Sequence, residues 1–166
     1  MNSLYKDQSK AKQDTINNFC KKIKIACKAR RSKDFLIAAR IESFIFGKGL
    51  GDALRRANKY SKAGADLILI HSKDKTPKEI FKFAKHFRKS PNFKPMIAVP
   101  STYSKVKEKD LIKYGFKIVI YANHLLRAAY PSMEFAAKSI LKNFRSYDLE
   151  KRIISINKIL NIIPKN

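Results

Sequence analysis

The stretch FLIAARIESFIFGKGLGDALRRANKYSKAGADLILIHSKDKTPKEI, residues 35–80, holds two short apolar runs separated by an amphipathic segment. The runs FLIAA at 35–39 and DLILI at 66–70 are apolar without alternation, which is typical of buried parallel strands. Between them, the polar stretch 40–51 predicts a loop, and residues 52–63 predict a helix that a glycine ends. Strand, helix and strand in this order predict a parallel βαβ unit.

The same alternation continues along the chain. The runs MIAV at 96–99 and KIVIY at 117–121 predict two more strands. Further helices are predicted at 13–29, 76–89, 108–115, 124–144 and 148–162. The helix at 76–89 is expected to begin with a capping box from Thr76 to Glu79, with Pro77 at the first helical position.

Four alternating strands and helices, with no visible linker, predict an α/β fold in one domain over residues 1–166. Two architectures satisfy this order. One is a doubly wound sheet, and the other is a part of a (β/α) barrel.

Composition narrows the class of protein. Of 166 residues, 45% are apolar, which is enough for a globular core. Because no apolar run approaches about 18 residues, no membrane span is predicted. The polar first 15 residues do not look like a secretory signal, so we expect a cytoplasmic protein.

Cys20 and Cys27 lie about 10 Å apart along one predicted helix, too far for a disulfide, so free, half-buried thiols are expected.

The formal net charge is +24, from 37 basic and 13 acidic residues. Only nine of the basic residues are arginines, and the lysines are spread over every helical segment rather than collected in one arm. Codon bias in an AT-rich genome explains such a composition equally well. We therefore expect only non-specific, salt-sensitive binding to nucleic acids, with a dedicated polyanion-binding module as the less favoured alternative.

Polar residues follow each predicted strand, and active sites of parallel α/β folds lie at the carboxyl ends of the strands. The residues are Arg40 and Glu42, then His71, then Ser101 and Thr102, then Asn123. A guanidinium, an imidazole and neutral donors together suit a small substrate that carries phosphate or carboxylate groups.

Simpler interpretations exist for each of these residues. Arg40 and Glu42 could form a purely structural ion pair, His71 could be a packed histidine, and Asn123 could cap the next helix. No Walker loop, dinucleotide fingerprint or nucleophile elbow is present in the sequence.

Several stretches together resemble the phosphoenolpyruvate mutase family of the isocitrate lyase/phosphonomutase superfamily. They are the 35–80 stretch, MIAVPSTY at 96–103, IVIYANHLLRAAYPSM at 118–133 and the tail ISINKILNIIP at 154–164. The Arg-x-Glu of residues 40–42 is more similar to the mutase branch than to the lyase branch. Phosphonopyruvate hydrolase is similar through some of the same stretches and remains an alternative.

The resemblance implies a fold, an activity and a site. The fold would be the C-terminal half of a (β/α)₈ barrel, its last four strand–helix units, with an additional C-terminal helix. The activity would be the Mg²⁺-dependent interconversion of phosphoenolpyruvate and phosphonopyruvate, in phosphonate biosynthesis. By resemblance, Arg40 and His71 are catalytic and bind the phosphoryl group. Asn2, Ser3 and Glu42 join them in substrate binding, and Asn123 is added as a neutral donor at the end of the last predicted strand.

The sequence also departs from the family pattern. The aspartates and the glutamate that hold Mg²⁺ in the family, directly or through water, have no counterparts here, so no metal ligand is assigned to this chain. We therefore expect a fragment or truncated form that is inactive alone, or one half of a split enzyme. Its expected partners are phosphoenolpyruvate or phosphonopyruvate, an N-terminal half-barrel, and further copies of the chain.

Overall fold

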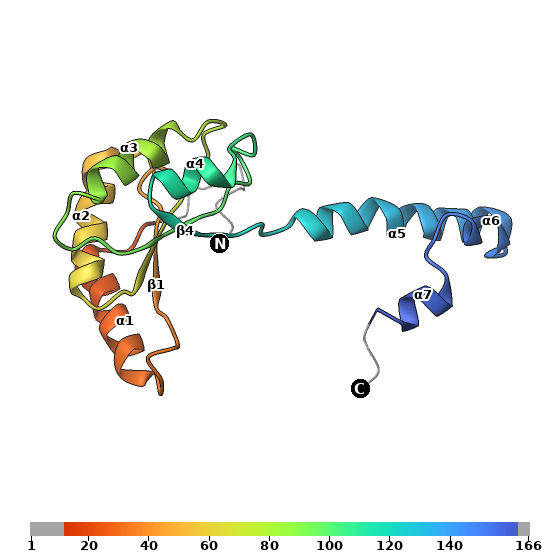
Figure 1. Cartoon of the computed structure of the whole chain (residues 1–166), viewed down its shortest axis with the longest axis horizontal. Helices are drawn as coiled ribbons and strands as arrows, with labels where there is room; N and C mark the ends of the chain where they lie inside the picture. Colours follow the sequence, from red (N-terminus) through yellow and green to blue (C-terminus); the bar gives the residue numbers. More distant parts are fainter. Residues whose placement is uncertain (1–11, 163–166) are drawn as a thin grey trace. The chain divides into compact units, whose positions relative to one another are not determined.

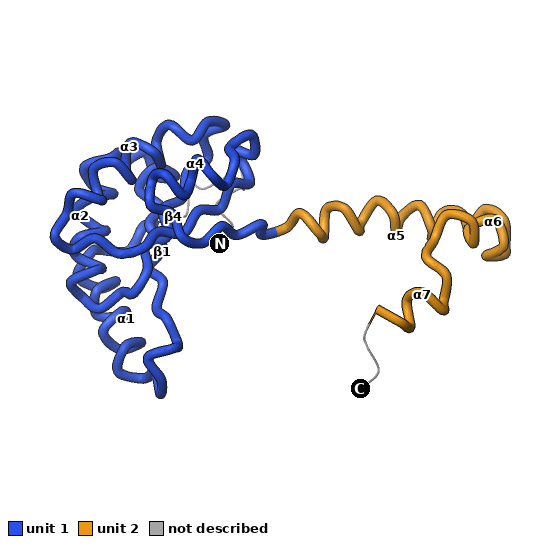
Figure 2. The backbone as a smooth tube through the Cα atoms, in the orientation of Figure 1, with its two compact units in different colours: residues 1–122 blue, residues 123–166 orange. Residues whose placement is uncertain are grey.

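The computed structural model describes residues 12–162. The chain divides into two compact units, residues 1–122 and 123–166, which Figure 2 distinguishes by colour. Each unit is described by itself. Between residues 12 and 162, no helix combines the length and the apolar character needed to cross a membrane.

The first unit contains one parallel sheet of four strands. The strands are β1 (Ala38–Ile41), β2 (Leu67–Ile70), β3 (Met96–Ala98) and β4 (Phe116–Val119), and they lie side by side in sequence order. A doubly wound sheet reverses its strand order at a switch point, whereas a barrel adds each strand next to the previous one. The doubly wound alternative is therefore wrong, and the barrel sector is confirmed.

Four helices accompany this sheet. They are α1 (Ile16–Ala29), α2 (Gly49–Lys62), α3 (Lys78–Phe87) and α4 (Glu108–Lys113). Helix α1 packs on α2, and α2 packs on α3 and on the first two strands (Figure 1). The main core lies between helices and sheet, and includes Ala39, Ile41, Ile68, Ile70, Ala57, Phe83, Phe87 and Met96.

Helix α1 shows why an amphipathic segment forms the outer layer. Thr15 caps it by accepting a hydrogen bond from the backbone N–H of Asn18 at 3.2 Å. Its inner face carries Ile23, which is buried, and Cys20 and Cys27, which are free and partly buried as predicted. The Cys27 thiol donates to the Gly64 carbonyl at 3.2 Å, and so helps hold α1 against the end of α2.

The first strand begins three residues later than predicted. Phe35 and Leu36 are 66% and 52% exposed, so the apolar run is not a strand along its whole length. The reason is a side chain: the Ile37 N–H donates to the Asp66 carboxylate at 2.8 Å. Arg30 donates to the same carboxylate oxygen at 2.6 Å, which fixes the chain just before β1.

The predicted capping box is wrong. Helix α3 has Pro77 at its N-cap, and within the described chain this cap forms no side-chain hydrogen bond. The Thr76 hydroxyl donates to Asp74 at 3.2 Å, and Glu79 accepts a hydrogen bond from the Ser72 hydroxyl. Thr76 and Glu79, the two expected partners of the capping box, therefore bind residues of the loop after β2 instead.

The second unit contains α5 (His124–Asn143), α6 (Tyr147–Glu150) and α7 (Ile156–Leu160). The prediction of a single helix at 148–162 is therefore wrong. The chain leaves helical geometry after α6, and a new helix, α7, begins where Ser155 caps it. In this described part of the chain, α5 has no buried residue and exposes large apolar side chains. They are Leu125, Leu126, Tyr130, Met133, Phe135, Ile140 and Leu141.

A buried ionic network ties the loop after β1 to the helical layer. Asp52, in the first turn of α2, accepts hydrogen bonds from the Ser43 hydroxyl and from Arg56 Nε, each at 2.8 Å. Arg56 also donates to the Tyr60 hydroxyl at 2.7 Å and to the Asp14 carbonyl at 2.9 Å. One buried guanidinium thus joins α2 to the segment that precedes α1.

Replacing Asp52 by alanine is expected to cost about 3–5 kcal/mol of unfolding free energy at pH 7, because Arg56 would stay buried without its partner. Burial opposes ionisation, but hydrogen bonds from Arg56, Ser43 and Arg55 hold the pKa of Asp52 below its ordinary value. The contribution is therefore complete above about pH 4, the unfolded pKa, and is lost as pH falls through the lower folded pKa.

Urea unfolding at pH 7 and at pH 3 measures this effect. The matched control is Asp34→Ala, which removes an exposed carboxylate that accepts a hydrogen bond from Ser32 on its own turn. Equal losses for the two variants at pH 7 would contradict the role of the network.

Candidate functional site

Arg40 and Glu42 form an ion pair at the carboxyl end of β1. Arg40 Nε donates to Glu42 Oε1 at 2.8 Å, and Nη2 lies 2.6 Å from the same oxygen. The Arg40 side chain is 44% exposed and that of Glu42 is 26% exposed. Arg40 lies inside β1 rather than in the predicted loop, so the strand itself sets its direction.

His71 is the first residue after β2. Its backbone N–H donates to the Ile41 carbonyl at 3.1 Å, which extends the β1–β2 ladder by one residue. The side chain is buried at 3% exposure, and neither ring nitrogen has a hydrogen-bond partner between residues 12 and 162. A buried imidazole without such a partner can offer one donor and one acceptor to a bound molecule.

The electrostatic surroundings keep His71 neutral. Burial lowers the pKa of His71 from its ordinary value, the charge of Arg40 lowers it further, and Glu42 acts in the opposite direction. The imidazole is therefore uncharged near pH 7, and Arg40 supplies the positive charge of this region.

The strand register places these three side chains on one face of the sheet. Arg40 pairs with Leu69 and Ile41 pairs with Ile70. Since side chains alternate along a strand, Arg40, Glu42 and His71 point to one side, and Ile41 and Ile70 point to the other. Ile41 and Ile70 belong to the core under the helices, so the polar side chains lie on the opposite face.

The ends of β3 and β4 differ from the first two strand ends. The Thr102 hydroxyl donates to the Ser72 carbonyl at 3.1 Å, so this residue holds the neighbouring loop. Asn123 lies in the second unit at the N-cap of α5, where no side-chain capping hydrogen bond forms in the described structure. Asn123 thus occupies the N-cap position that the capping alternative gave it, but its side chain makes no capping hydrogen bond within the described residues. Asn2 and Ser3 lie outside the described residues.

Two residues of the region were not assigned a site role from the sequence. Ser72 is fully buried next to His71, and its hydroxyl donates to Glu79. Tyr103 is fully buried after β3, and burial raises the pKa of its hydroxyl to about 12, so this group stays protonated at neutral pH. Neither residue belongs to a sequence motif with a mechanism, and only their burial distinguishes them.

The described residues do not fit a magnesium site. Between residues 12 and 162, no cluster of three or more histidine, cysteine, aspartate or glutamate side chains could hold a metal ion. Glu42, the carboxylate among the predicted site residues, is paired with Arg40. No step of the chemistry is therefore assigned to Mg²⁺ on these residues.

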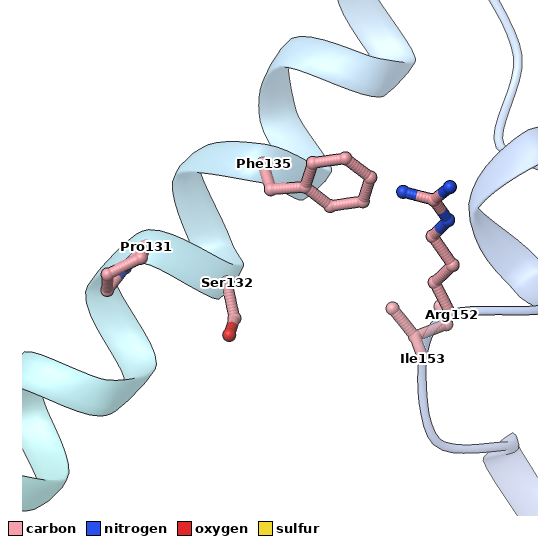
Figure 3. A pocket seen from close by; sticks show the side chains of 5 residues that line it. All are labelled: Pro131, Ser132, Phe135, Arg152 and Ile153. Atoms are coloured by element: carbon pink, nitrogen blue, oxygen red, sulfur yellow. The ribbon is translucent and has the colours of Figure 1, made fainter.

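A pocket of the second unit has none of the predicted site residues in its lining. It is lined by Pro131, Ser132, Phe135, Arg152 and Ile153. The Arg152 guanidinium lies 5.1 Å from the centre of the Phe135 ring, and Figure 3 shows the two groups facing each other. This cation–π contact holds the chain after α6 against α5.

Consecutive parallel βα units, with a guanidinium and a buried imidazole where β1 and β2 end, define a sector of a (β/α)₈ barrel. The family model described as phosphoenolpyruvate phosphomutase matches residues 3–141. The chain belongs to this family, as the resemblance in its sequence predicted.

Individual relatives agree with this assignment. Phosphoenolpyruvate phosphomutase of Tetrahymena pyriformis is 37% identical over 161 residues, which are 97% of this chain and 52% of the relative. The crystal structure of phosphoenolpyruvate phosphomutase from Streptomyces platensis subsp. rosaceus is 34% identical, with a TM-score of 0.87 over 96% of this chain and 54% of that one. A phosphonopyruvate hydrolase in complex with oxalate and Mg²⁺ is 35% identical, with a TM-score of 0.82 over 95% of this chain and 54% of that chain.

The chain spans about half the length of the curated relatives that it matches. The matching part is the C-terminal half of the phosphomutase barrel, as predicted. Mg²⁺ accompanies a relative of this family, and residues 12–162 of this chain hold no cluster of three or more potential ligand side chains.

The neutral state of His71 predicts a pH dependence of stability. Because the folded pKa is below the unfolded value of about 6.5, the unfolded state binds more protons as pH falls through this range. The free energy of unfolding should therefore fall from pH 7 to pH 5. Urea titrations at the two pH values should show a smaller fall for His71→Gln.

The matched control is His86→Gln, because His86 is exposed on α3. This variant should keep the pH dependence of the unchanged chain. If the free energy of unfolding fell equally from pH 7 to pH 5 in the His71 and His86 variants, His71 would not be the group that causes the pH dependence.

Proposed function

We propose that this chain provides the phosphoryl-binding half of a phosphoenolpyruvate mutase site. The observation that carries the proposal is the placement of Arg40 and His71 on one face, at the carboxyl ends of two adjacent parallel strands. A guanidinium can bind two phosphoryl oxygens at once, and a neutral imidazole can donate one further hydrogen bond.

In this proposal each described residue has one role. Arg40 and His71 hold the phosphoryl group while it moves between the enol oxygen of phosphoenolpyruvate and the methylene carbon of phosphonopyruvate. Donors aimed at a group whose charge shifts during the reaction stabilise the transition state. Glu42 holds the Arg40 guanidinium in one direction through the contacts at 2.6 and 2.8 Å. Asn2, Ser3 and Asn123 are proposed as additional substrate contacts.

A second candidate is the hydrolysis of phosphonopyruvate. It is favoured by the 35% identity to a phosphonopyruvate hydrolase over nearly the whole chain. In that reaction water accepts the phosphoryl group, and Arg40 and His71 would have the same binding roles. The two candidates differ in product, because only hydrolysis releases pyruvate and phosphate.

We further propose that residues 1–166 act as one domain of a cytoplasmic barrel that other polypeptide completes. Strands β1 and β4 each have a single neighbour within the described sheet, and unpaired strand edges attract further strands. The exposed apolar side chains of α5 support burial against more protein, from an N-terminal half-barrel or from another copy. The Mg²⁺ ligands are proposed to lie in the completing half.

Complementation tests the proposed function. The chain is produced together with the N-terminal half of the Tetrahymena relative, and phosphonopyruvate conversion is measured with Mg²⁺. The mutase proposal expects phosphoenolpyruvate as product, and no turnover by either half alone. Accumulation of pyruvate and phosphate instead would favour the hydrolase candidate.

Variants of the assembled complex test the residue roles. Arg40→Ala and His71→Ala are each expected to lower turnover by about 10²–10³-fold, the usual effect of removing a donor to developing charge. Arg31→Ala and His86→Ala are matched controls, since both side chains are exposed and have no proposed role in the site. An assembled complex that keeps full turnover with Arg40→Ala would refute the proposal.

A further inference from the structure

We infer that Ser72 and Glu79 are positioning residues for His71, and that they set the place of its imidazole from the loop after β2 and the helix that follows it. The inference rests on the proposed function, because it concerns how the proposed phosphoryl-binding imidazole is held. It assigns a role to a contact between the loop after β2 and the first turn of α3 that the sequence motifs did not indicate.

Within the described residues, no hydrogen bond of the His71 ring fixes its position. The ring is buried, and neither nitrogen has a hydrogen-bond partner between residues 12 and 162. Its place is therefore set by packing and by the backbone on either side. On the β1 side, the His71 N–H is bound to the Ile41 carbonyl at 3.1 Å. The other side depends on Ser72.

Ser72 is held from three directions. Its hydroxyl donates to Glu79 Oε2 and accepts from the Asp74 N–H at 3.0 Å. Its carbonyl accepts from the Thr102 hydroxyl at 3.1 Å. The fully buried residue that follows His71 is thus joined to α3, to its own loop and to the loop after β3.

Glu79 is suited to form the strongest of the three contacts that hold Ser72. It lies in the first turn of α3, where the helix dipole favours a negative charge. A hydrogen bond from a hydroxyl to a carboxylate is stronger than one between neutral groups, and its partial burial limits competition from water. The helix and the segment 71–72 are therefore expected to keep one relative position when a ligand binds His71.

Such precision matters for the proposed chemistry, because a displacement of about 1 Å in a catalytic group can cost about 10²-fold in rate. A contact that merely stabilised the fold would not have to influence the imidazole. The test therefore reads the environment of the ring itself.

The experiment is an NMR pH titration of the histidine ring signals in the intact chain, which has three histidines. In Ser72→Ala and Glu79→Ala, the loop is released and water reaches the ring, so the pKa of His71 should rise toward its ordinary value of 6.5. In Glu79→Gln, the amide oxygen still accepts from Ser72, and the titration should stay close to that of the unchanged chain.

The sign of the shift separates positioning from simple electrostatics. The charges that act on His71 are those of Arg40 and Glu42, which all of these variants keep. If Glu79 acted only through its charge, Glu79→Ala and Glu79→Gln would both lower the pKa of His71. Positioning instead predicts a rise in the alanine variant and little change in the glutamine variant.

The matched control is Glu108→Ala. Glu108 also lies in the first turn of a helix, α4, and accepts a hydrogen bond from the Tyr121 hydroxyl at 2.7 Å. This variant should leave the titration of His71 unchanged. If Glu79→Ala does not fold, Ser72→Ala and Ser72→Thr provide the same comparison, since threonine keeps the hydroxyl.

An unchanged His71 titration in folded Ser72→Ala or Glu79→Ala would overturn the inference. So would equal downward shifts in the alanine and glutamine variants of Glu79. The readout needs no substrate, so it is independent of turnover. Predicted shifts together with an inactive completed barrel would count against the proposed function and leave the positioning roles in place.

Discussion

The parallel register between β1 and β2 is the constraint on which the proposed site depends. Arg40 pairs with Leu69, and the His71 N–H closes the ladder on the Ile41 carbonyl. A shift by one residue would turn every side chain of one strand to the opposite face. The burial of apolar side chains prevents this shift, because it would move the fully buried Ile41 or Ile70 out of the core under the helices.

Two polar networks then fix the loops at the strand ends, whose approximate position the register sets. Asp52 and Arg56 hold the loop that follows Arg40 and Glu42, and Ser72 with Glu79 holds the loop that follows His71. Both networks use a carboxylate in the first turn of the next helix. Each strand end is therefore supported by its following helix, whereas Arg40 and His71 point to the opposite face of the sheet.

The sequence predicted much of the first unit because its signals are local. Unbroken apolar runs identified all four strands within three residues, and Gly64, with a φ of +112°, follows the end of α2 as expected. The errors arose where distant side chains intervened. Asp66 binds the Ile37 N–H just before β1, and Glu79 binds Ser72 rather than capping α3.

By itself, the sequence determined the alternation of strands and helices, the family, and the polar residues where strands end. These follow from local apolar patterns and from motifs, which need no partner distant in the chain. Tertiary structure alone decided the consecutive strand order, and it showed that Arg40, Glu42 and His71 share a face while Ser72 is buried beside them. Register and burial depend on contacts between segments about thirty residues apart, and no local pattern records those contacts.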